Sequence, residues 1–234
     1  HILWLEEISK EDVPLVGGKN ASLGEMYSRL RSKGINIPHG FCLTSEAYWH
    51  FLKFNKIDQP LKVIFQEFNP KNINSLEETG RKARELVLKA DFPEDLKKEV
   101  VVAYQKLSSE AKNSVGSIKK SRVSSWARVA VRSSATAEDL PTASFAGQHE
   151  TFLNVRGKDA LLKAIKNCLA SLFTNRAIAY REEKGFAHLK IALSVGILEM
   201  VSSDLSSSGI MFTLDTETGF RNVVLINSIY GVGE

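Results

Sequence analysis

The sequence predicts a mixed α/β (α+β) fold, in which buried strands are combined with amphipathic helices. The apolar runs at residues 129–131 (VAV) and 191–201 (IALSVGILEMV) are typical of strands that enter the interior of a sheet. Elsewhere, apolar residues recur three and four positions apart, which is the period of a helix with one buried face. With 234 residues and 43% hydrophobic content, the chain can form a full core as one domain or a domain and a half.

The N-terminal part is predicted to contain two strands and two helices. Residues 2–5 form a short strand, and residues 34–43 form a turn into a second strand. Residues 13–20 (VPLVGGKN) form a glycine loop that leads into a helix. The buried face of that helix carries Leu23, Met26, Tyr27 and Leu30. The second helix begins at Thr44 and buries Tyr48, Phe51 and Leu52.

Residues 57–122 are predicted to be mainly helical. Pro93 followed by two acidic residues is typical of a helix start. The stripe that follows consists of Leu96, Val100, Tyr104 and Leu107. Residues 108–125 are polar and rich in serine, so we expect a loop there. Its basic cluster, Lys119, Lys120 and Arg122, is interpreted as a solvated loop and not as a nucleic-acid-binding face.

The C-terminal third is predicted to return to the sheet and then to form a separate strand pair. Residues 150–155 form a strand, and Gly157 begins a turn into a long helix. The apolar face of that helix carries Leu161, Leu162, Ile165, Leu169 and Leu172. Arg176 and Arg181 either reach a ligand or hold the helix surface, and the structural role is preferred. Strands 210–214 and 222–228 are joined by a turn at 215–219.

Arg132 is the first candidate site residue, because it follows the strand 129–131 and is expected to leave the sheet at its end. A guanidinium in that position requires an anion, and its planar fork suits a phosphate or a carboxylate. The hydroxyl groups that follow would add hydrogen-bond donors for the same partner; they belong to Ser133, Ser134 and Thr136.

Residues 142–147 (TASFAG) are nearly all small, so the backbone there can approach a ligand and offer its amides to phosphate oxygens. The alternative is that Arg132 pairs with Glu138 or Asp139 and that this segment is only a turn. The residues alone leave both interpretations open.

Lys19 is the second candidate, because it stands at a predicted helix entrance. Free backbone amides and the positive end of the helix dipole favour an anion at such a place. The pattern is not a Walker loop, which requires Gly-x-x-x-x-Gly-Lys-Ser/Thr. The alternative for Lys19 is an ordinary surface lysine.

The overall composition predicts a cytoplasmic protein without a nucleic-acid or membrane partner. The net charge is +4, from 31 basic and 27 acidic residues spread along the chain. Cys42 and Cys168 are far apart and fit neither a zinc site nor a disulfide framework. No apolar run approaches the roughly 18 residues of a membrane span, and no signal peptide is recognised.

Several stretches resemble one family of phosphotransferases. The run VRSSATAEDLPTASFAGQHETFLNV resembles the signature of the phosphoenolpyruvate synthases (pyruvate, water dikinases), within the wider group that includes pyruvate phosphate dikinase. GGKNASLGEM resembles the first motif of these enzymes, in which the lysine contacts the nucleotide's phosphates. CLASLFTNRAIAYR is also similar. The resemblance covers almost the whole chain, whereas the chain covers only part of such an enzyme.

This resemblance implies an ATP-grasp-like nucleotide-binding domain. Residues 1–202 would be its N-terminal lobe, within which 57–122 form a mainly helical insertion. Residues 203–234 would be the truncated beginning of the second lobe.

The resemblance also implies roles for individual residues. Lys19 and Arg132 would be catalytic residues that bind the phosphates of ATP. The backbone that caps the phosphates would include Ser144, Ala146 and Gly147. The adenine would lie against Glu199, Met200 and Val201 at a hinge between lobes, although a strand end with an exposed glutamate is the alternative. Glu234 resembles an acid near the nucleotide, in contact with either metal or ribose.

Two residues depart from the pattern of the family. Relatives usually have glutamine at the position of Leu198, so a side-chain hydrogen bond is lost or supplied elsewhere. His39 stands where proline or glycine is usual and is assigned no role.

The implied function is the ATP-binding N-terminal fragment of an enzyme that converts ATP, pyruvate and water to AMP, phosphoenolpyruvate and phosphate. A phosphohistidine domain, a pyruvate-binding barrel and the Mg²⁺ ligands are expected beyond Glu234, so the fragment alone should be inactive. The full-length enzyme can be a homo-oligomer. The alternatives are a fragment of pyruvate phosphate dikinase or of an antibiotic phosphotransferase, and a non-catalytic nucleotide-binding module.

Overall fold

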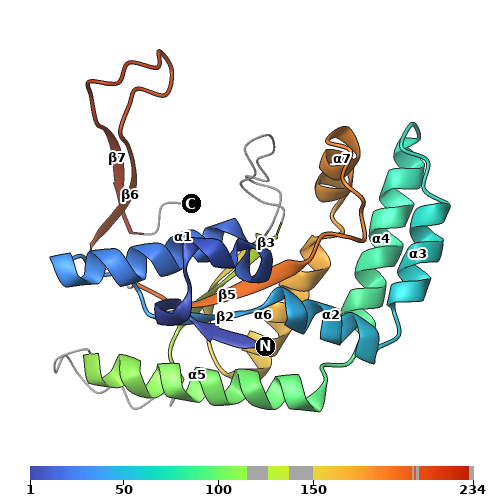
Figure 1. Ribbon diagram of the computed structural model, residues 1–234, viewed down its shortest axis with the longest axis horizontal. Coiled ribbons are helices and arrows are strands. Elements are labelled where there is room, and N and C mark those ends of the chain that lie inside the picture. The colour runs from blue at the N-terminus through green and yellow to red at the C-terminus, as the bar shows by residue number, and fades with distance from the viewer. Residues whose placement is uncertain (115–125, 137–149, 202, 204–205, 232–234) are drawn as a thin grey trace. The chain divides into compact units, whose positions relative to one another are not determined.

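Among the residues that the computed structural model describes, five strands form an antiparallel sheet that belongs to the first of two units (Figure 1). The described residues are 1–114, 126–136, 150–201, 203 and 206–231. The units comprise His1–Met200 and Val201–Glu234. In spatial order the strands are β1 (Ile2–Trp4), β2 (Gly40–Leu43), β5 (Leu193–Glu199), β3 (Val129–Ala135) and β4 (Thr151–Val155). The prediction of a mixed fold of strands and helices is confirmed.

Helices cover both faces of this sheet. One face carries α1 (Val13–Leu30), which the 3₁₀ turns Leu5–Glu7, Lys10–Asp12 and Arg31–Lys33 flank. The opposite face carries a larger core formed with α2 (Ser45–Phe54), α3 (Asp58–Gln66), α4 (Ile73–Lys89), α5 (Glu94–Ser114) and α6 (Lys158–Ser171). Figure 1 shows α1 on one side of the sheet and α5 on the other; α7 (Asn175–Glu183) contacts α4. No helix in the described ranges has both the length and the apolar run that a bilayer span requires.

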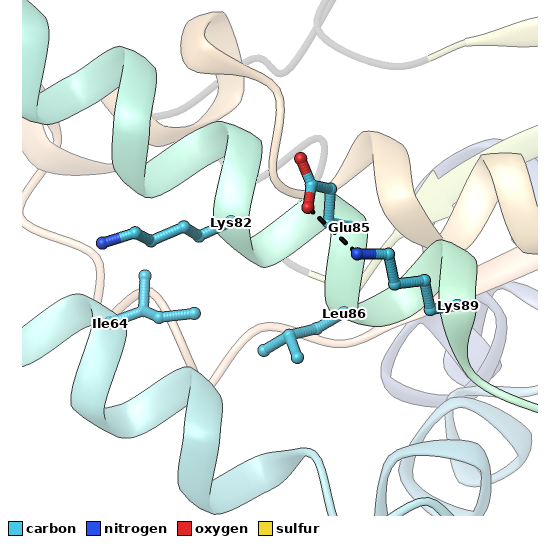
Figure 2. A pocket seen from close by; sticks show the side chains of 5 residues that line it. All are labelled: Ile64, Lys82, Glu85, Leu86 and Lys89. Atoms are coloured by element: carbon cyan, nitrogen blue, oxygen red, sulfur yellow. Dashed lines mark hydrogen bonds and ion pairs between the residues drawn. The ribbon is translucent and has the colours of Figure 1, made fainter.

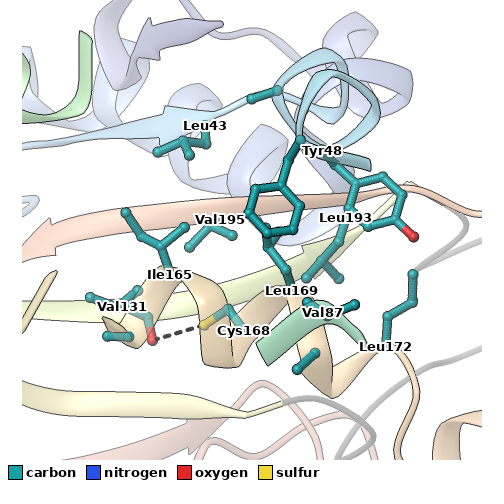
Figure 3. Packing of buried hydrophobic residues seen from close by; sticks show 14 of the residues in the cluster. Leu43, Tyr48, Val87, Val131, Ile165, Cys168, Leu169, Leu172, Leu193 and Val195 are labelled. Carbon is teal, nitrogen blue, oxygen red and sulfur yellow. Dashed lines mark hydrogen bonds between the residues drawn. The ribbon is translucent and has the colours of Figure 1, made fainter. Parts of the chain in front are cut away.

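The larger core lies between the sheet and α6 (Figure 3). Val131 of β3 and Val195 of β5 lie in this core beside Ile165 and Cys168 of α6. The thiol of Cys168 donates a hydrogen bond to the carbonyl oxygen of Val131 at 3.8 Å. Cys42 is buried on the other face of the sheet, and burial raises the pKa of both thiols, so both stay protonated at neutral pH.

β5 is the buried central strand that the apolar run 191–201 predicted. It pairs with β2 on one side and with β3 on the other. Leu193 and Ile197 point into the larger core, whereas Leu198 belongs to the smaller core beneath α1. Because neighbours cover both edges and both faces, nearly every position in the strand is apolar or small.

β3 is longer than predicted, and this changes the position of Arg132. The strand continues to Ala135, which pairs with Leu193. Arg132 therefore lies within the sheet and not at the end of a strand. The reason is the length of β5, because its first half supplies hydrogen-bonding partners for the polar residues that follow Arg132.

The serine-rich segment after Leu107 is helical through Ser114, where a loop was predicted. Ser108 Oγ donates a hydrogen bond to the carbonyl of Tyr104 at 2.7 Å, so its hydroxyl is satisfied within the helix. The basic cluster at 119–122 lies outside the described residues. The predicted glycine loop at 13–20 is also helical, apart from a single break at Gly17.

The second unit contains an antiparallel pair, β6 (Ser207–Phe212) and β7 (Leu225–Tyr230). The predicted strand pair is thus confirmed, although β6 begins earlier and β7 later than predicted. The turn at 215–219 is confirmed as well, because the amide of Gly219 donates to the carbonyl of Asp215 at 2.9 Å.

His188 is expected to make the fold less stable in mild acid. Burial and the nearby charge of Arg181 lower the pKa of His188, against the opposing effect of Glu182. Its ring stacks on that of Phe65, with 4.7 Å between the ring centroids. Because the pKa is depressed in the folded state, the neutral ring contributes stability above the unfolded pKa of about 6.5, which is lost as the pH falls.

Urea unfolding at pH 7 and at pH 5 measures this effect. The wild type should lose more of its unfolding free energy on acidification than His188→Gln, which cannot titrate. An equal loss in both proteins would contradict the prediction.

Candidate functional site

Arg132 lies in the middle of β3, beside Gly196 of β5 and Thr151 of β4. The preceding residue, Val131, points into the larger core, so Arg132 points to the opposite face, which α1 covers. Arg132 is partly buried there. Because Gly196 has no side chain, the surface of β5 next to Arg132 has room for a side chain of α1, and the amide of Asn20 occupies this space.

Gly17 brings the start of α1 onto this face. Its φ of 73° and ψ of 162° lie in a region that is almost restricted to glycine. A Cβ at this position would lie within 3.0 Å of Ser134 Oγ and of the carbonyl oxygens of Ser134 and Ala135. The backbone of α1 therefore rests directly on the end of β3, and Lys19 follows two residues later in a partly buried position.

The structure thus brings the two predicted phosphate ligands, Lys19 and Arg132, to the same face of the sheet. One comes from the helix and the other from the strand on which that helix rests. A compact ammonium and a planar guanidinium are complementary groups for binding the oxygens of a polyphosphate.

The hydroxyl groups that follow Arg132 serve the fold, contrary to the expectation that they would face an anion. Ser133 Oγ donates to the carbonyl of Glu150 at 3.1 Å, and Thr136 Oγ1 donates to the carbonyl of Ala192 at 3.3 Å. The hydroxyl of Ser134 is fully buried beneath α1. The reason is the length of β3, which keeps Ser133 and Ser134 inside the sheet and Thr136 directly at its end.

Asn20 is a neighbour of the site that sequence reasoning missed. Its side chain is 1% exposed, and its Nδ2 donates to Ser194 Oγ at 3.1 Å. Its backbone amide donates to Ser134 Oγ at 3.4 Å. A signal did exist, because Ser134 and Ser194 place hydroxyls in otherwise buried strands, and such groups require polar partners.

The predicted adenine contacts lie around the end of β5. The backbone amide of Glu199 donates to the carbonyl of His39 at 2.8 Å, and the backbone amide of Met200 donates to the carbonyl of Arg128 at 2.9 Å. Both amides complete the sheet, so a hydrogen bond to adenine would come from other groups, including those of Val201. Burial raises the pKa of Glu199, whereas the nearby His39 acts to lower it. Glu199 is partly buried, in contrast to the exposed glutamate at a strand end that was the alternative interpretation.

The remaining predicted ligands lie outside the described residues. They are Ser144, Ala146, Gly147 and Glu234. Glu138 and Asp139, the two alternative partners of Arg132, lie outside the described residues as well.

Arg181 has the structural role that was preferred for it, although it is buried and not on the helix surface. Its Nη1 donates to the carbonyl of Leu172 at 2.7 Å, and its Nε donates to His188 Nδ1 at 3.3 Å. Burial lowers the pKa of Arg181 to about 10, so it stays charged at neutral pH. Arg176 is exposed on α7.

His39 is part of an aromatic stack. Its ring lies between those of Trp4 and Tyr27, at centroid distances of 5.2 and 5.4 Å. Its Nδ1 is 3.0 Å from Glu110 Oε2, and its Nε2 is 3.6 Å from Glu6 Oε2. This residue therefore joins α5 and the turn after β1 to the entry of β2.

A small groove lies between α3 and α4 (Figure 2). It has a volume of about 200 Å³ and is lined by Ile64, Lys82, Glu85, Leu86 and Lys89. Glu85 pairs with Lys89 at 3.3 Å, as the dashed line in Figure 2 shows. The groove is smaller than the roughly 300–1,000 Å³ of typical ligand sites, and it contains none of the predicted site residues.

Comparison with known proteins gives a family match over most of the chain. Residues 13–234 match the family described as "Pyruvate phosphate dikinase, AMP/ATP-binding domain". The chain is 50% identical over 233 residues to a protein of Aquifex aeolicus named phosphoenolpyruvate synthase. This match covers 100% of this chain and 26% of the relative.

Proteins of the same name from Synechocystis sp. and Escherichia coli are 48% and 44% identical over 233 residues. Each match covers 100% of this chain and 28% of the relative. The chain thus spans about a quarter of the length of these relatives.

Proposed function

Because this chain belongs to the family of the pyruvate phosphate dikinase AMP/ATP-binding domain, we propose that it is the N-terminal ATP-binding part of a phosphoenolpyruvate synthase. The proposed reaction converts ATP, pyruvate and water to AMP, phosphoenolpyruvate and phosphate through a phosphohistidine carried on another part of the protein. This chain binds and aligns ATP for that reaction. We place the protein in the cytoplasm.

The placement of Arg132 and of the helix that carries Lys19 on one face of the sheet is the observation that carries this proposal. Phosphoryl transfer is catalysed mainly by positioning and by stabilisation of charge. Arg132 binds two phosphate oxygens with its planar fork, and Lys19 acts as a point charge. The segment that contains Ser144, Ala146 and Gly147 caps the phosphates with its backbone amides.

We assign the adenine to the segment Glu199, Met200 and Val201, in an ATP-grasp-like arrangement of two lobes. Residues 1–202 form the first lobe, and residues 203–234 begin the second. The change of unit after Met200 supports a boundary at this point. Glu234 lies near the nucleotide in this arrangement.

The described residues do not form a dedicated metal site. Within the described residues, no group of three or more histidine, cysteine, aspartate or glutamate side chains could hold a metal ion. We propose that the Mg²⁺ ligands of the full-length enzyme lie beyond Glu234.

Calorimetric titration with ATP of the protein at its native length tests the phosphate site. Arg132→Ala should weaken ATP binding by about 1.5 kcal/mol or more, the scale of a charge-assisted hydrogen bond. Arg132→Lys should recover only part of this loss, because lysine keeps the charge but not the fork.

Arg176→Ala, which removes an exposed arginine from α7, is the matched control and should bind ATP as the wild type does. An Arg132→Ala protein that binds ATP with unchanged affinity would remove Arg132 from the site. A wild-type protein that does not bind ATP would overturn the proposed function.

A further inference from the structure

Asn20 stands directly after Lys19 and holds the start of α1 to the sheet. The backbone around Lys19 is restrained on both sides, because Gly17 rests on β3 and the amide of Asn20 donates to Ser134 Oγ at 3.4 Å. The side chain of Lys19 therefore leaves from a segment whose position β3 determines.

The side chain of Asn20 extends this restraint to two further strands. Its Nδ2 donates to Ser194 Oγ on β5 at 3.1 Å, and Ser194 Oγ donates to the carbonyl of Leu43 on β2 at 2.5 Å. All these side chains are buried, so hydrogen bonds inside the fold replace those lost to water. An apolar residue could fill this space, but it could not specify the register of the helix on three strands.

Asn20 also borders Arg132. A Cβ on Gly196 would lie 2.5 Å from Asn20 Oδ1, so the amide of Asn20 occupies the space above Gly196. Gly196 is the cross-strand neighbour of Arg132. The residue that follows Lys19 is thus packed against the residue that pairs with Arg132.

From these contacts we infer that Asn20 is a positioning residue, which holds Lys19 at the distance from Arg132 that the phosphates of ATP require. The inference rests on the proposed function. Asn20 acts through Lys19 and does not itself touch the nucleotide. Its removal should therefore weaken binding of the phosphates and leave binding of the nucleoside unchanged.

A double-mutant cycle on the protein at its native length tests this inference. Asn20→Ala should weaken ATP binding about tenfold and change adenosine binding less than twofold. In a Lys19→Met background, the same substitution should change ATP binding less than twofold, because the group that it positions is gone. A residue that only stabilised the fold would give the same fold-change in both backgrounds.

Ser194→Ala provides a second variant if Asn20→Ala does not fold, because it keeps Asn20 and removes its link to β5. Its loss of ATP affinity should likewise disappear in the Lys19→Met background. Thermal unfolding of each variant tests whether it is folded at the assay temperature. Equal effects with and without Lys19 would overturn the inference alone. Unchanged ATP affinity in Lys19→Met, or a wild type that does not bind ATP, would overturn the proposed phosphate site and the inference with it.

Discussion

Gly17→Ala is expected to lower the free energy of unfolding by about 3 kcal/mol and to abolish tight ATP binding. The backbone conformation of Gly17 is one that residues with a side chain rarely adopt, at a penalty of roughly 1–3 kcal/mol. The added methyl group would also lie within 3.0 Å of two backbone carbonyl oxygens of β3, and overpacking of this kind costs about 1–3 kcal/mol. The helix must move off the strand, and Lys19 moves with it.

Gly34→Ala separates the penalty of the backbone conformation from the penalty of overpacking. Gly34 also has a positive φ, of 82°, but a Cβ there would meet nothing within 4 Å. It should therefore destabilise the fold by only about 1 kcal/mol, from backbone conformation alone. Urea unfolding and ATP titration of both variants provide the measurement, and similar losses in the two proteins would contradict the packing argument.

Tyr104→Phe is expected to lower the free energy of unfolding by about 2 kcal/mol. The hydroxyl of Tyr104 donates to the carbonyl of Ala127 at 2.5 Å and accepts from the amide of Gly157 at 3.1 Å. One hydroxyl thus joins α5 to the segments that lead into β3 and α6. Its loss leaves two backbone groups without this partner, at a penalty of about 1–3 kcal/mol for a buried group.

The ring of Tyr104 should remain in place in this variant, because it is fully buried and stacks on Trp126 with 4.7 Å between the ring centroids. Tyr230→Phe is the control, since Tyr230 is 92% exposed, and it should leave stability unchanged. Urea unfolding of both variants tests the prediction. A Tyr104→Phe protein as stable as the wild type would show that the two hydrogen bonds contribute nothing net.

Part of the candidate site could be predicted from the sequence, because its signals are local. A glycine pair before a lysine marks a helix entrance, and an arginine after an apolar run marks a charged residue at a sheet. Neither pattern reveals that Lys19 and Arg132 lie on the same face. That depends on the long-range contact between Gly17 and Ser134, which are far apart in the chain.

The strands, the helices and most of their buried faces could be predicted from local patterns, because the apolar periods of 2 and 3.6 residues act over short stretches. Met26, predicted on the buried face of α1, is instead 38% exposed. The length of β3 and the helical state of residues 108–114 depend on long-range contacts and could not be predicted. In both places polar residues found partners inside the fold, as Thr136 did with Ala192 and Ser108 did with Tyr104. Only the tertiary structure could assign Asn20 its role, since the hydroxyls that satisfy its side chain and its amide come from distant strands.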